Sequence, residues 1–209
     1  MNVNIFDLDN TLYAPERELF SLIDVRINRY MCEVVGIPAA QVDGLRRAYW
    51  QKYGVTLGGL MRHYQVDPED YLEYVHDVDV QARLYPDPGL RAALSALDGL
   101  KVVFTNGSRG HAERVLEALG LGDQFSAIFD IRVADYRPKP YADPYQAVLR
   151  HLGAQGSQCV MVEDSLPNLK TAKELGMSTV LVGSGEAAPY VDARASCAEQ
   201  AANWLRSRP

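Results

Sequence analysis

Residues 3–12 read VNIFDLDNTL, and this stretch decides the fold class. Its first four residues form a short apolar, β-rich run. A run this short predicts a strand that is buried on both faces, as in a parallel sheet. Four similar runs follow at residues 102–104, 127–129, 160–162 and 179–182. The sequence therefore predicts a parallel sheet of at least five strands.

Helical patterns lie between the later runs. Apolar residues recur at helical spacing within residues 112–119, 145–152 and 169–175. Each segment is followed by a glycine suited to a left-handed cap, namely Gly120, Gly153 and Gly176. Ser165 is expected to be the N-cap of the third helix. Strands that alternate with helices predict a Rossmann-like, doubly wound α/β fold.

The second run begins almost a hundred residues after the first, which is too long for one crossover. Residues 16–84 have helical patterns, interrupted near Gly36, Gly54 and Asp67. We therefore expect about four inserted helices. The predicted division is an α/β core, residues 1–15 and 85–209, and a helical cap domain, residues 16–84. The tail at 186–206 is expected to hold one helix that packs on the core.

The overall composition narrows the possible partners. The 209-residue chain has a formal net charge of −6, so it has no global attraction to nucleic acid polymers or anionic membranes. No apolar run approaches the ~18–20 residues of a membrane span. The three cysteines lack zinc spacing. We expect reduced thiols, a cytoplasmic location, and a monomer or homodimer.

Polar clusters follow four of the predicted strands. In chain order they are Asp7 and Asp9; Thr105, Asn106 and Gly107; Lys139; and Glu163 and Asp164. Ligands of an open parallel sheet bind outside the carboxyl ends of its strands. The fold therefore predicts that all four clusters face one crevice.

The acids of this crevice suit a hard cation. Asp7 and Asp164, with Glu163 as a further candidate, supply oxygen ligands of the kind that Mg²⁺ prefers. Clustered carboxylates repel one another, so a cation is needed to keep them ionised. The sequence therefore predicts Mg²⁺ as a cofactor.

The same residues can transfer a phosphoryl group. Lys139 and the cation can neutralise it, while the Thr105 hydroxyl and the amides near Asn106 and Gly107 hold its oxygens. The Asp7 carboxylate can attack phosphorus. Asp9 can protonate the leaving oxygen and then accept a proton from water.

Each cluster has an ordinary explanation when taken alone. An Asp-x-Asp pair is common in solvated turns, Lys139 could be a surface lysine, and Thr105 to Gly107 could be a simple turn. Acids at 163 and 164 could offset a helix dipole. The order of all four clusters, each at or beyond a strand end, is what favours the catalytic interpretation.

The ordered set resembles the haloacid dehalogenase (HAD) superfamily. The matching motifs are the segment from Phe6 to Tyr13, Thr105 in Phe104-Thr105-Asn106-Gly107, Lys139 before Pro140, and Val162-Glu163-Asp164-Ser165 followed by Asn168. The resemblance implies that Asp7 is the nucleophile and Asp9 the general acid/base. It implies that Asp7, the backbone carbonyl of Asp9 and Asp164 bind Mg²⁺, and that residues 16–84 form a cap. Aspartate at position 9 favours phosphatases over dehalogenases.

A narrower likeness concerns the substrate. The first motif, and Phe104 to Ser108 followed by His111-Ala112 and Leu119-Gly120, look like the pyrimidine 5'-nucleotidase-like branch. The likeness implies that the substrate is a small phosphomonoester, and among these a nucleoside monophosphate. The alternatives are a phosphomutase acting on a sugar phosphate and a non-catalytic binding or regulatory protein.

Other polar residues have two possible interpretations. His111 could border the site, but a place on a helix surface is the favoured expectation. His76, Asp77 and Asp79 could bind metal, although a polar helix end is favoured. Polar residues of the insert, including Arg46, Tyr49 and His63, could contact a base or a leaving group, but a solvated face or the core of the cap is the favoured expectation.

Overall fold

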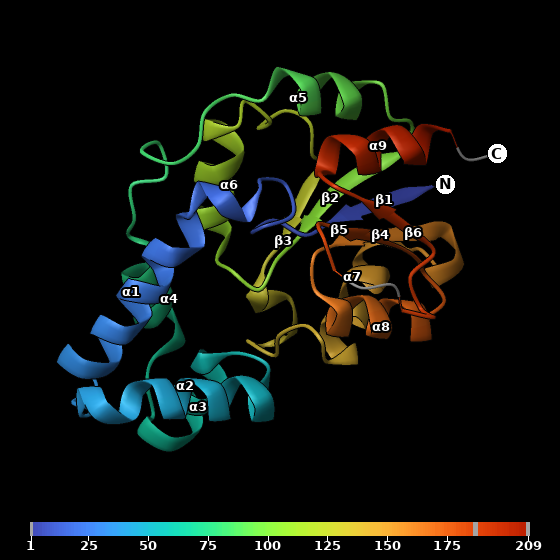
Figure 1. The fold of residues 1–209 in the computed structure, drawn as a ribbon. Helices are drawn as coiled ribbons and strands as arrows, with labels where there is room; N and C mark the ends of the chain where they lie inside the picture. Colours follow the sequence, from blue (N-terminus) through green and yellow to red (C-terminus); the bar gives the residue numbers. More distant parts are fainter. Residues whose placement is uncertain (1, 186–187, 208–209) are drawn as a thin grey trace.

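The computed structural model describes residues 2–185 and 188–207. Within them, one parallel sheet has the strand order β3-β2-β1-β4-β5-β6 (Figure 1). The strands are β1 Val3–Phe6, β2 Leu100–Phe104, β3 Ala127–Phe129, β4 Cys159–Glu163, β5 Ser178–Val182 and β6 Ala193–Ala195. The order reverses direction at β1, as in a doubly wound fold. The predicted fold class is confirmed.

Helices cover both faces of the sheet. One apolar core packs beneath α5 Pro88–Ser95, α6 Arg109–Ala118 and α9 Ala198–Arg206. The other packs against α7 Ala142–Leu152 and α8 Leu166–Glu174. Figure 1 shows α5 and α9 on one side of the sheet and α7 and α8 on the other. Successive residues of β1 face opposite sides, so Ile5 belongs to one core and Phe6 to the other.

All five expected strands are present, and their ends differ from the expectation by at most two residues. The expected tail helix is confirmed, because α9 lies in this segment and packs on the core, but β6 was not expected. The described part of that segment contains β6 as well as α9, while residues 186–187 lie outside the described residues. The strand was missed because its sequence, Ala-Arg-Ala, has no apolar run and only its edge position next to β5 makes it a strand.

The expected helix ends are largely observed. Gly120, Gly153 and Gly176 all have positive φ, as left-handed caps require. Ser165 occupies the N-cap position of α8, but its side chain makes no capping hydrogen bond. Three 3₁₀ helices complete the described core: η1 Pro15–Arg17, η2 Ile131–Ala134 and η3 Gly156–Gln158.

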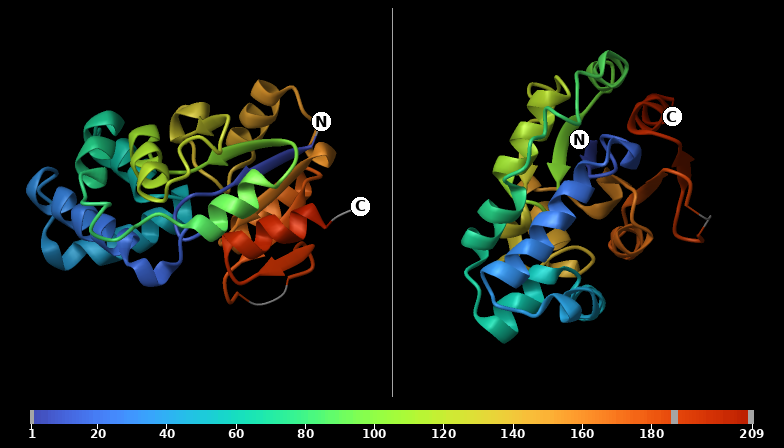
Figure 2. Two further views of the ribbon diagram at one scale, coloured as in Figure 1. Left: turned by 90° about the horizontal axis from the view of Figure 1, so that it is seen from above. Right: turned by 60° about the vertical axis from the view of Figure 1, so that its left-hand side comes forward.

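The long insertion after β1 forms α1 Leu19–Glu33, α2 Ala39–Tyr53, α3 Thr56–Tyr64 and α4 Pro68–His76. These helices enclose an apolar core of their own, which Ile131 of η2 joins. Figures 1 and 2 show them beside the end of the sheet opposite the N terminus, where the strands have their carboxyl ends. Their position leaves the strand ends facing the insert.

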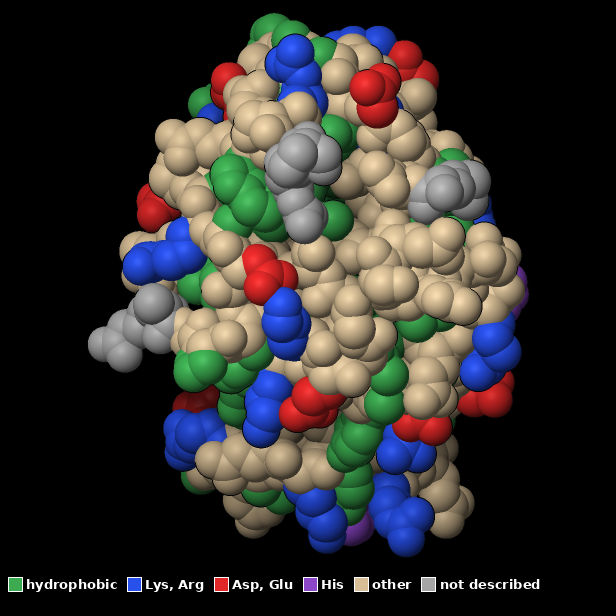
Figure 3. Space-filling model, turned by 90° about the vertical axis from the view of Figure 1, so that its right-hand side faces the viewer, with side chains coloured by type: hydrophobic (Ala, Val, Ile, Leu, Met, Phe, Trp, Pro, Cys, Tyr) green, Lys and Arg blue, Asp and Glu red, His purple; other side chains and the backbone are tan. Residues whose placement is uncertain are grey.

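The surface has no strongly one-signed region on the face seen in Figure 3, where acidic and basic side chains are interspersed. No helix within residues 2–185 and 188–207 is long and apolar enough to cross a membrane.

Candidate active site

The strand order brings the sequence clusters together. β1 lies between β2 and β4, and Phe6 pairs with Val103 on one side and Val162 on the other. The Asp7 N–H continues the ladder by donating to the Val162 carbonyl at 2.9 Å. Asp7 therefore leaves the sheet at the topological switch point, where ligands of such folds bind.

A tight turn directs Asp9 back over this point. The Leu12 N–H donates to the Leu8 carbonyl at 2.9 Å, and Asn10 has a φ of 61°. Asparagine tolerates this left-handed conformation better than most residues do. Leu8 and Leu12 are buried, so the turn is anchored in the core.

Lys139 is the centre of the buried charge network. Its Nζ donates to Asp7 Oδ1 at 2.7 Å, to the Phe104 carbonyl at 2.7 Å and to Glu163 Oε2 at 2.8 Å. The side chain is 1% exposed. These contacts use all three ammonium donors. The structure thus gives Lys139 a role in holding Asp7, and its predicted contact with a phosphoryl group stays a prediction.

Burial and mutual repulsion shift the acids of this network. Burial and the Glu163 carboxylate raise the pKa of Asp7 to about 7, against the opposing effect of Lys139. Burial raises the pKa of Glu163 to about 7 as well, although Lys139 opposes this. Burial also disfavours the charge of Lys139, but Asp7 and Glu163 outweigh it and raise the pKa of the lysine. The lysine therefore stays charged.

The donor set fits a divalent cation. One carboxylate oxygen from each of Asp7, Glu163 and Asp164 lies within 4.8 Å of the others. Burial also raises the pKa of Asp164. When all three acids are ionised, the single lysine leaves two negative charges unbalanced. A Mg²⁺ ion, which prefers oxygen ligands, would balance them. The fit supports the predicted site, with Glu163 also bonded to Lys139.

The segment after β2 supports Lys139 as well as facing the cavity. The Asn106 amide accepts from the Lys139 N–H at 2.8 Å and donates to the Lys139 carbonyl at 3.0 Å. Thr105 Oγ1 accepts from the Gly107 N–H at 2.9 Å. The Asn106 side chain therefore fixes the lysine segment. The roles of Thr105, Asn106 and Gly107 in phosphate binding stay predictions.

Asp9 lies in a separate polar environment. Its Oδ1 accepts from the Tyr13 hydroxyl at 2.6 Å and from His111 Nε2 at 2.8 Å. Burial favours the neutral acid, but the His111 charge and the bonds from His111 and Tyr13 lower the pKa of Asp9 overall. Asp7 and Asp9 thus differ in acidity although only one residue separates them.

The expected surface position of His111 is wrong, because the residue is 0% exposed and contacts Asp9. His76 is the last residue of α4, but it is buried rather than solvated. Its ring stacks on His111 with centroids 4.6 Å apart. The sequence hid both contacts, since they join residues from different elements.

A cavity of about 710 Å³ opens above these groups, between the core and the insert. The core lines it with the residues of the predicted site, among them Asp7, Asp9, Lys139 and Asp164. Most of the insert side chains that line it are apolar or aromatic, including Phe20, Ile23, Ile27, Trp50, Leu57, Tyr71, Leu72 and Val75. The exposed Trp50 and Phe20 had not been singled out in the sequence.

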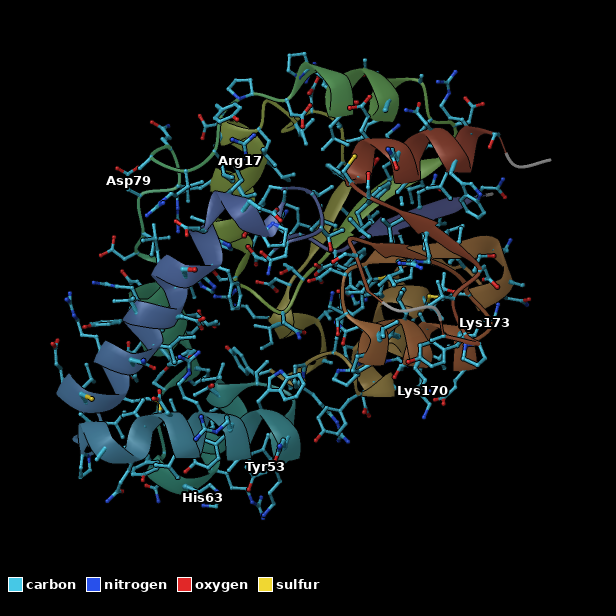
Figure 4. All side chains as sticks on the ribbon, viewed as in Figure 1. Arg17, Tyr53, His63, Asp79, Lys170 and Lys173 are labelled. Carbon is cyan, nitrogen blue, oxygen red and sulfur yellow. The ribbon has the colours of Figure 1, made fainter. Side chains whose placement is uncertain are left out.

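Polar residues of the insert divide between the two expected roles. Tyr49 is buried in the core of the insert and stacks on His63, which also contacts Tyr53 at 2.8 Å. Figure 4 shows Tyr53 and His63 close together on α2 and α3. Arg46 is the exception. It lines the cavity while pairing with Asp24.

The fold and this geometry define a class: a doubly wound α/β protein with a carboxylate nucleophile candidate and an acidic cation site. The chain matches the model of the haloacid dehalogenase-like hydrolase family over residues 1–176, and it belongs to that family.

Individual relatives agree with this assignment. The phosphoglycolate phosphatase of Rhodospirillum rubrum is 32% identical over 205 residues, covering 87% of this chain and 79% of the relative. Phosphate metabolism protein 8 of Saccharomyces cerevisiae is 27% identical over 196 residues, which are 86% of this chain. The match spans only 60% of the yeast protein.

Solved structures show the same fold. A HAD phosphatase from Thermococcus onnurineus superposes with a TM-score of 0.66 at 19% identity, covering 98% of both chains. The expected enzyme class, a phosphatase-type hydrolase of this family, is confirmed. The narrower likeness to pyrimidine 5'-nucleotidases stays a prediction.

Proposed function

We propose that the chain is a Mg²⁺-dependent phosphomonoesterase that works through a phosphorylated Asp7. The observation that carries the proposal is the placement of Asp7. Its carboxylate is held by Lys139 at 2.7 Å, lies beside the Asp164 carboxylate, and shares the cavity with Asp9. A buried, oriented carboxylate with a cation site is suited to nucleophilic attack on phosphorus.

The first step forms one bond and breaks another. An Asp7 oxygen attacks phosphorus while the bond from phosphorus to the leaving oxygen breaks, and Asp9 gives its proton to that oxygen. In the second step, water attacks the phosphorus of the acyl phosphate and passes its proton to Asp9. The bond from Asp7 to phosphorus then breaks, which releases inorganic phosphate and restores both acids.

The protonation of Asp9 depends on the substrate. Its lowered pKa makes it a carboxylate in the free protein. An anionic phosphoryl group beside it favours the neutral acid by charge repulsion, so we expect Asp9 to be protonated when substrate binds. Lys139 stays charged throughout and keeps Asp7 oriented.

Asp7, Asp164 and the Asp9 backbone carbonyl are the proposed Mg²⁺ ligands, with Glu163 as a further candidate. The bound cation would supply charge neutralisation at the phosphoryl oxygens. Thr105 and the amides of residues 106 and 107 are proposed to bind the same oxygens.

The proposed domain division gives the insert a separate task. Residues 16–84 would act as a cap over the core, residues 1–15 and 85–209, and would hold the leaving group. The cap and core are linked by Arg132 of η2, which pairs with Glu69 of α4, and by the Tyr141 hydroxyl, which donates to the Lys52 carbonyl at 2.9 Å. Tyr141 also lines the cavity.

A nucleoside monophosphate is the proposed substrate. The cavity of about 710 Å³ has room for a leaving group larger than a two-carbon acid, and its insert wall is largely apolar and aromatic. Arg46, a cation on that wall, is already paired with Asp24. These features support a planar, uncharged leaving group.

Phosphate release from a substrate panel with Mg²⁺, compared between wild type and Asp7→Asn, tests the proposal. The panel contains nucleoside monophosphates, phosphoglycolate and a sugar phosphate. We expect release by wild type, fastest from a nucleotide, and none above background by the variant. Equal release by the two proteins would contradict the role of Asp7.

The remaining outcomes separate the alternatives. A preference for phosphoglycolate, the substrate in the name of the R. rubrum relative, would correct the nucleotide proposal and leave the mechanism intact. A sugar phosphate isomer in place of free phosphate would indicate a mutase. Absence of both Mg²⁺ binding and turnover would indicate a non-catalytic protein.

A further inference from the structure

Both donors that contact the Asp9 carboxylate reach the same oxygen. The Tyr13 hydroxyl lies 2.6 Å and His111 Nε2 lies 2.8 Å from Oδ1. Burial and Asp9 raise the pKa of Tyr13, so its hydroxyl keeps its proton and acts as a donor. Because Oδ1 already accepts two hydrogen bonds, a proton carried by Asp9 belongs on Oδ2.

His111 is buried, and both its backbone and its ring are held by neighbouring groups. Its ring is 0% exposed, and its backbone N–H donates to Ser108 Oγ at 3.3 Å. Its other ring nitrogen, Nδ1, is buried without a hydrogen-bond partner among the described residues. An unsatisfied buried polar atom costs stability, and an apolar ring would fill the same space without this cost. The contact with Asp9 offers a reason for histidine here.

The ring that supports His111 comes from the insert. His76 stacks on it at 4.6 Å with an interplanar angle of 17°. His76 Nδ1 lies 2.9 Å from the Leu72 carbonyl within α4 and 3.0 Å from Ser108 Oγ in the core. Burial and the His111 charge lower the pKa of His76 to about 3, so the supporting ring is neutral.

The segment after β2 leaves little space beside this pair. A Cβ added at Gly107 would lie 3.4 Å from His111 Cδ2 and 3.5 Å from His76 Nε2. The two rings therefore pack directly against the predicted phosphate-binding segment. A Cβ at position 107 would lie in van der Waals contact with both of them.

We propose that His111 is a positioning residue for the general acid, holding Asp9 through Oδ1 so that Oδ2 faces the leaving oxygen. His76 extends this support from the insert to the core. The inference rests on the proposed function, in which Asp9 protonates the leaving group. It adds two residues that act through Asp9.

The inference predicts a dependence on the leaving group. A misplaced general acid slows the departure of a basic oxygen more than that of a weakly basic one, because only the basic oxygen needs a full proton. The two substrates compared are phenyl phosphate, with the more basic leaving oxygen, and p-nitrophenyl phosphate, with the less basic one. They have similar size and shape. The readout is kcat/KM, which reports on the steps up to phosphorylation of the enzyme.

His111→Phe keeps a stacking ring and removes the donor. We expect its kcat/KM for phenyl phosphate to fall on the order of 10-fold more than that for p-nitrophenyl phosphate. His111→Gln restores an N–H donor and should return the ratio of the two substrates toward the wild-type value. His76→Ala should change this ratio in the same direction, by less.

His151→Phe is the matched control. Like His76, His151 makes a ring contact with the carbonyl four residues earlier in its helix, at 2.9 Å. It lies on α7, however, and packs against Phe129. We expect no change in kcat/KM for either substrate. If His111→Phe does not fold, as judged by circular dichroism, His76→Ala decides: a greater fall for phenyl phosphate than for p-nitrophenyl phosphate supports the proposal, and an unchanged ratio contradicts it.

An equal fall for both substrates in His111→Phe, or no fall in that variant, would overturn the positioning role alone. The proposed function would stand, because wild type would still release phosphate. A wild type that releases phosphate from neither substrate would overturn the proposed function and this inference with it.

Discussion

The ends of the core strands and the wall of the insert face the same cavity but are built in different ways. Asp7, Thr105 and Glu163 each extend a strand or directly follow one, so the register of a parallel sheet places them together. The insert wall draws side chains from four helices, whose mutual angles depend on packing. The strand ends therefore place the residues of the proposed chemistry, while the shape of the insert wall depends on how its four helices pack.

Removal of the buried positive charge of Lys139 should have the largest effect on the stability of the core. Lys139→Met leaves Asp7 and Glu163 buried without their shared partner. Breaking such a network costs about 3–5 kcal/mol of unfolding free energy. We expect a loss in this range by urea denaturation, together with loss of phosphate release.

Lys173→Met is its control, because Lys173 pairs with Asp192 on the outer side of α8, where Figure 4 labels it. Its side chain is 39% exposed, so the expected cost is within about 1 kcal/mol. An equal loss of unfolding free energy in the two variants would contradict the claim that the buried network around Lys139 stabilises the core more than a surface ion pair does.

The next largest effect concerns the cation site. Asp164→Asn removes one of the three clustered carboxylates, so we expect Mg²⁺ affinity to fall by at least the roughly 10–100-fold that outer-shell changes cost elsewhere. Calorimetric titration with MgCl₂ measures it. Asp98→Asn, before β2 at the other end of the sheet, should bind like wild type. Unchanged affinity in Asp164→Asn would remove this residue from the site.

The buried acid at position 7 predicts a pH dependence without metal. Its pKa is about 7 in the folded protein against 3.8 ordinarily, so between these values the folded state holds more protons. This contribution to stability is present at low pH and is lost as pH rises through 7. Asp7→Asn does not titrate, so the melting temperature of the variant minus that of wild type should be larger at pH 8 than at pH 5.5.

The contribution of His76 has the opposite sign, since its pKa is lowered, but it cancels in this difference between two proteins. Mg²⁺ should stabilise wild type more at pH 8 than at pH 5.5, because protons compete for its ligands. A difference in melting temperature that does not change with pH would contradict the buried-charge account of Asp7.

The smallest effect is expected in the insert. Trp50 is 61% exposed and lines the cavity. Trp50→Ala should weaken binding of a nucleotide by roughly 0.5–1.5 kcal/mol, the scale of one aromatic contact. We expect a higher KM with kcat unchanged, and no change for glycerol phosphate, which lacks a ring. Equal KM changes for both substrates would exclude a stacking role.

The sequence predicted the sheet because its strands are continuous buried runs, and it brought Asp7, Thr105, Lys139 and Asp164 to one crevice. It failed at β6, which is a strand only through its neighbour. It also missed the contacts of Asp9. The one from Tyr13 is within a turn, but the one from His111 joins residues 102 positions apart. No local periodicity reports such a distance.

Within the site, the sequence predicted the positions of Lys139 and Asn106 but not all of their hydrogen-bond partners. Lys139 was expected to face the phosphoryl group, but its three donors are used by Asp7, Glu163 and Phe104. The backbone amide of Asn106 was expected to bind phosphate, which stays a prediction, whereas the bonds of its side chain to the Lys139 backbone were not expected. Residue type and strand position predicted where these side chains lie. They could not predict which partner satisfies each donor, because this depends on side-chain packing.

The most direct test of the central claim is to trap the phosphorylated enzyme. Wild type is mixed with substrate and Mg²⁺, quenched in acid within one turnover, digested and analysed by mass spectrometry. The account predicts one added phosphoryl group on the peptide that contains Asp7, located on Asp7 by fragmentation and absent from Asp7→Asn. Turnover with the phosphoryl group on another residue, or with no phosphorylated enzyme under any quench time, would contradict Asp7 as the nucleophile.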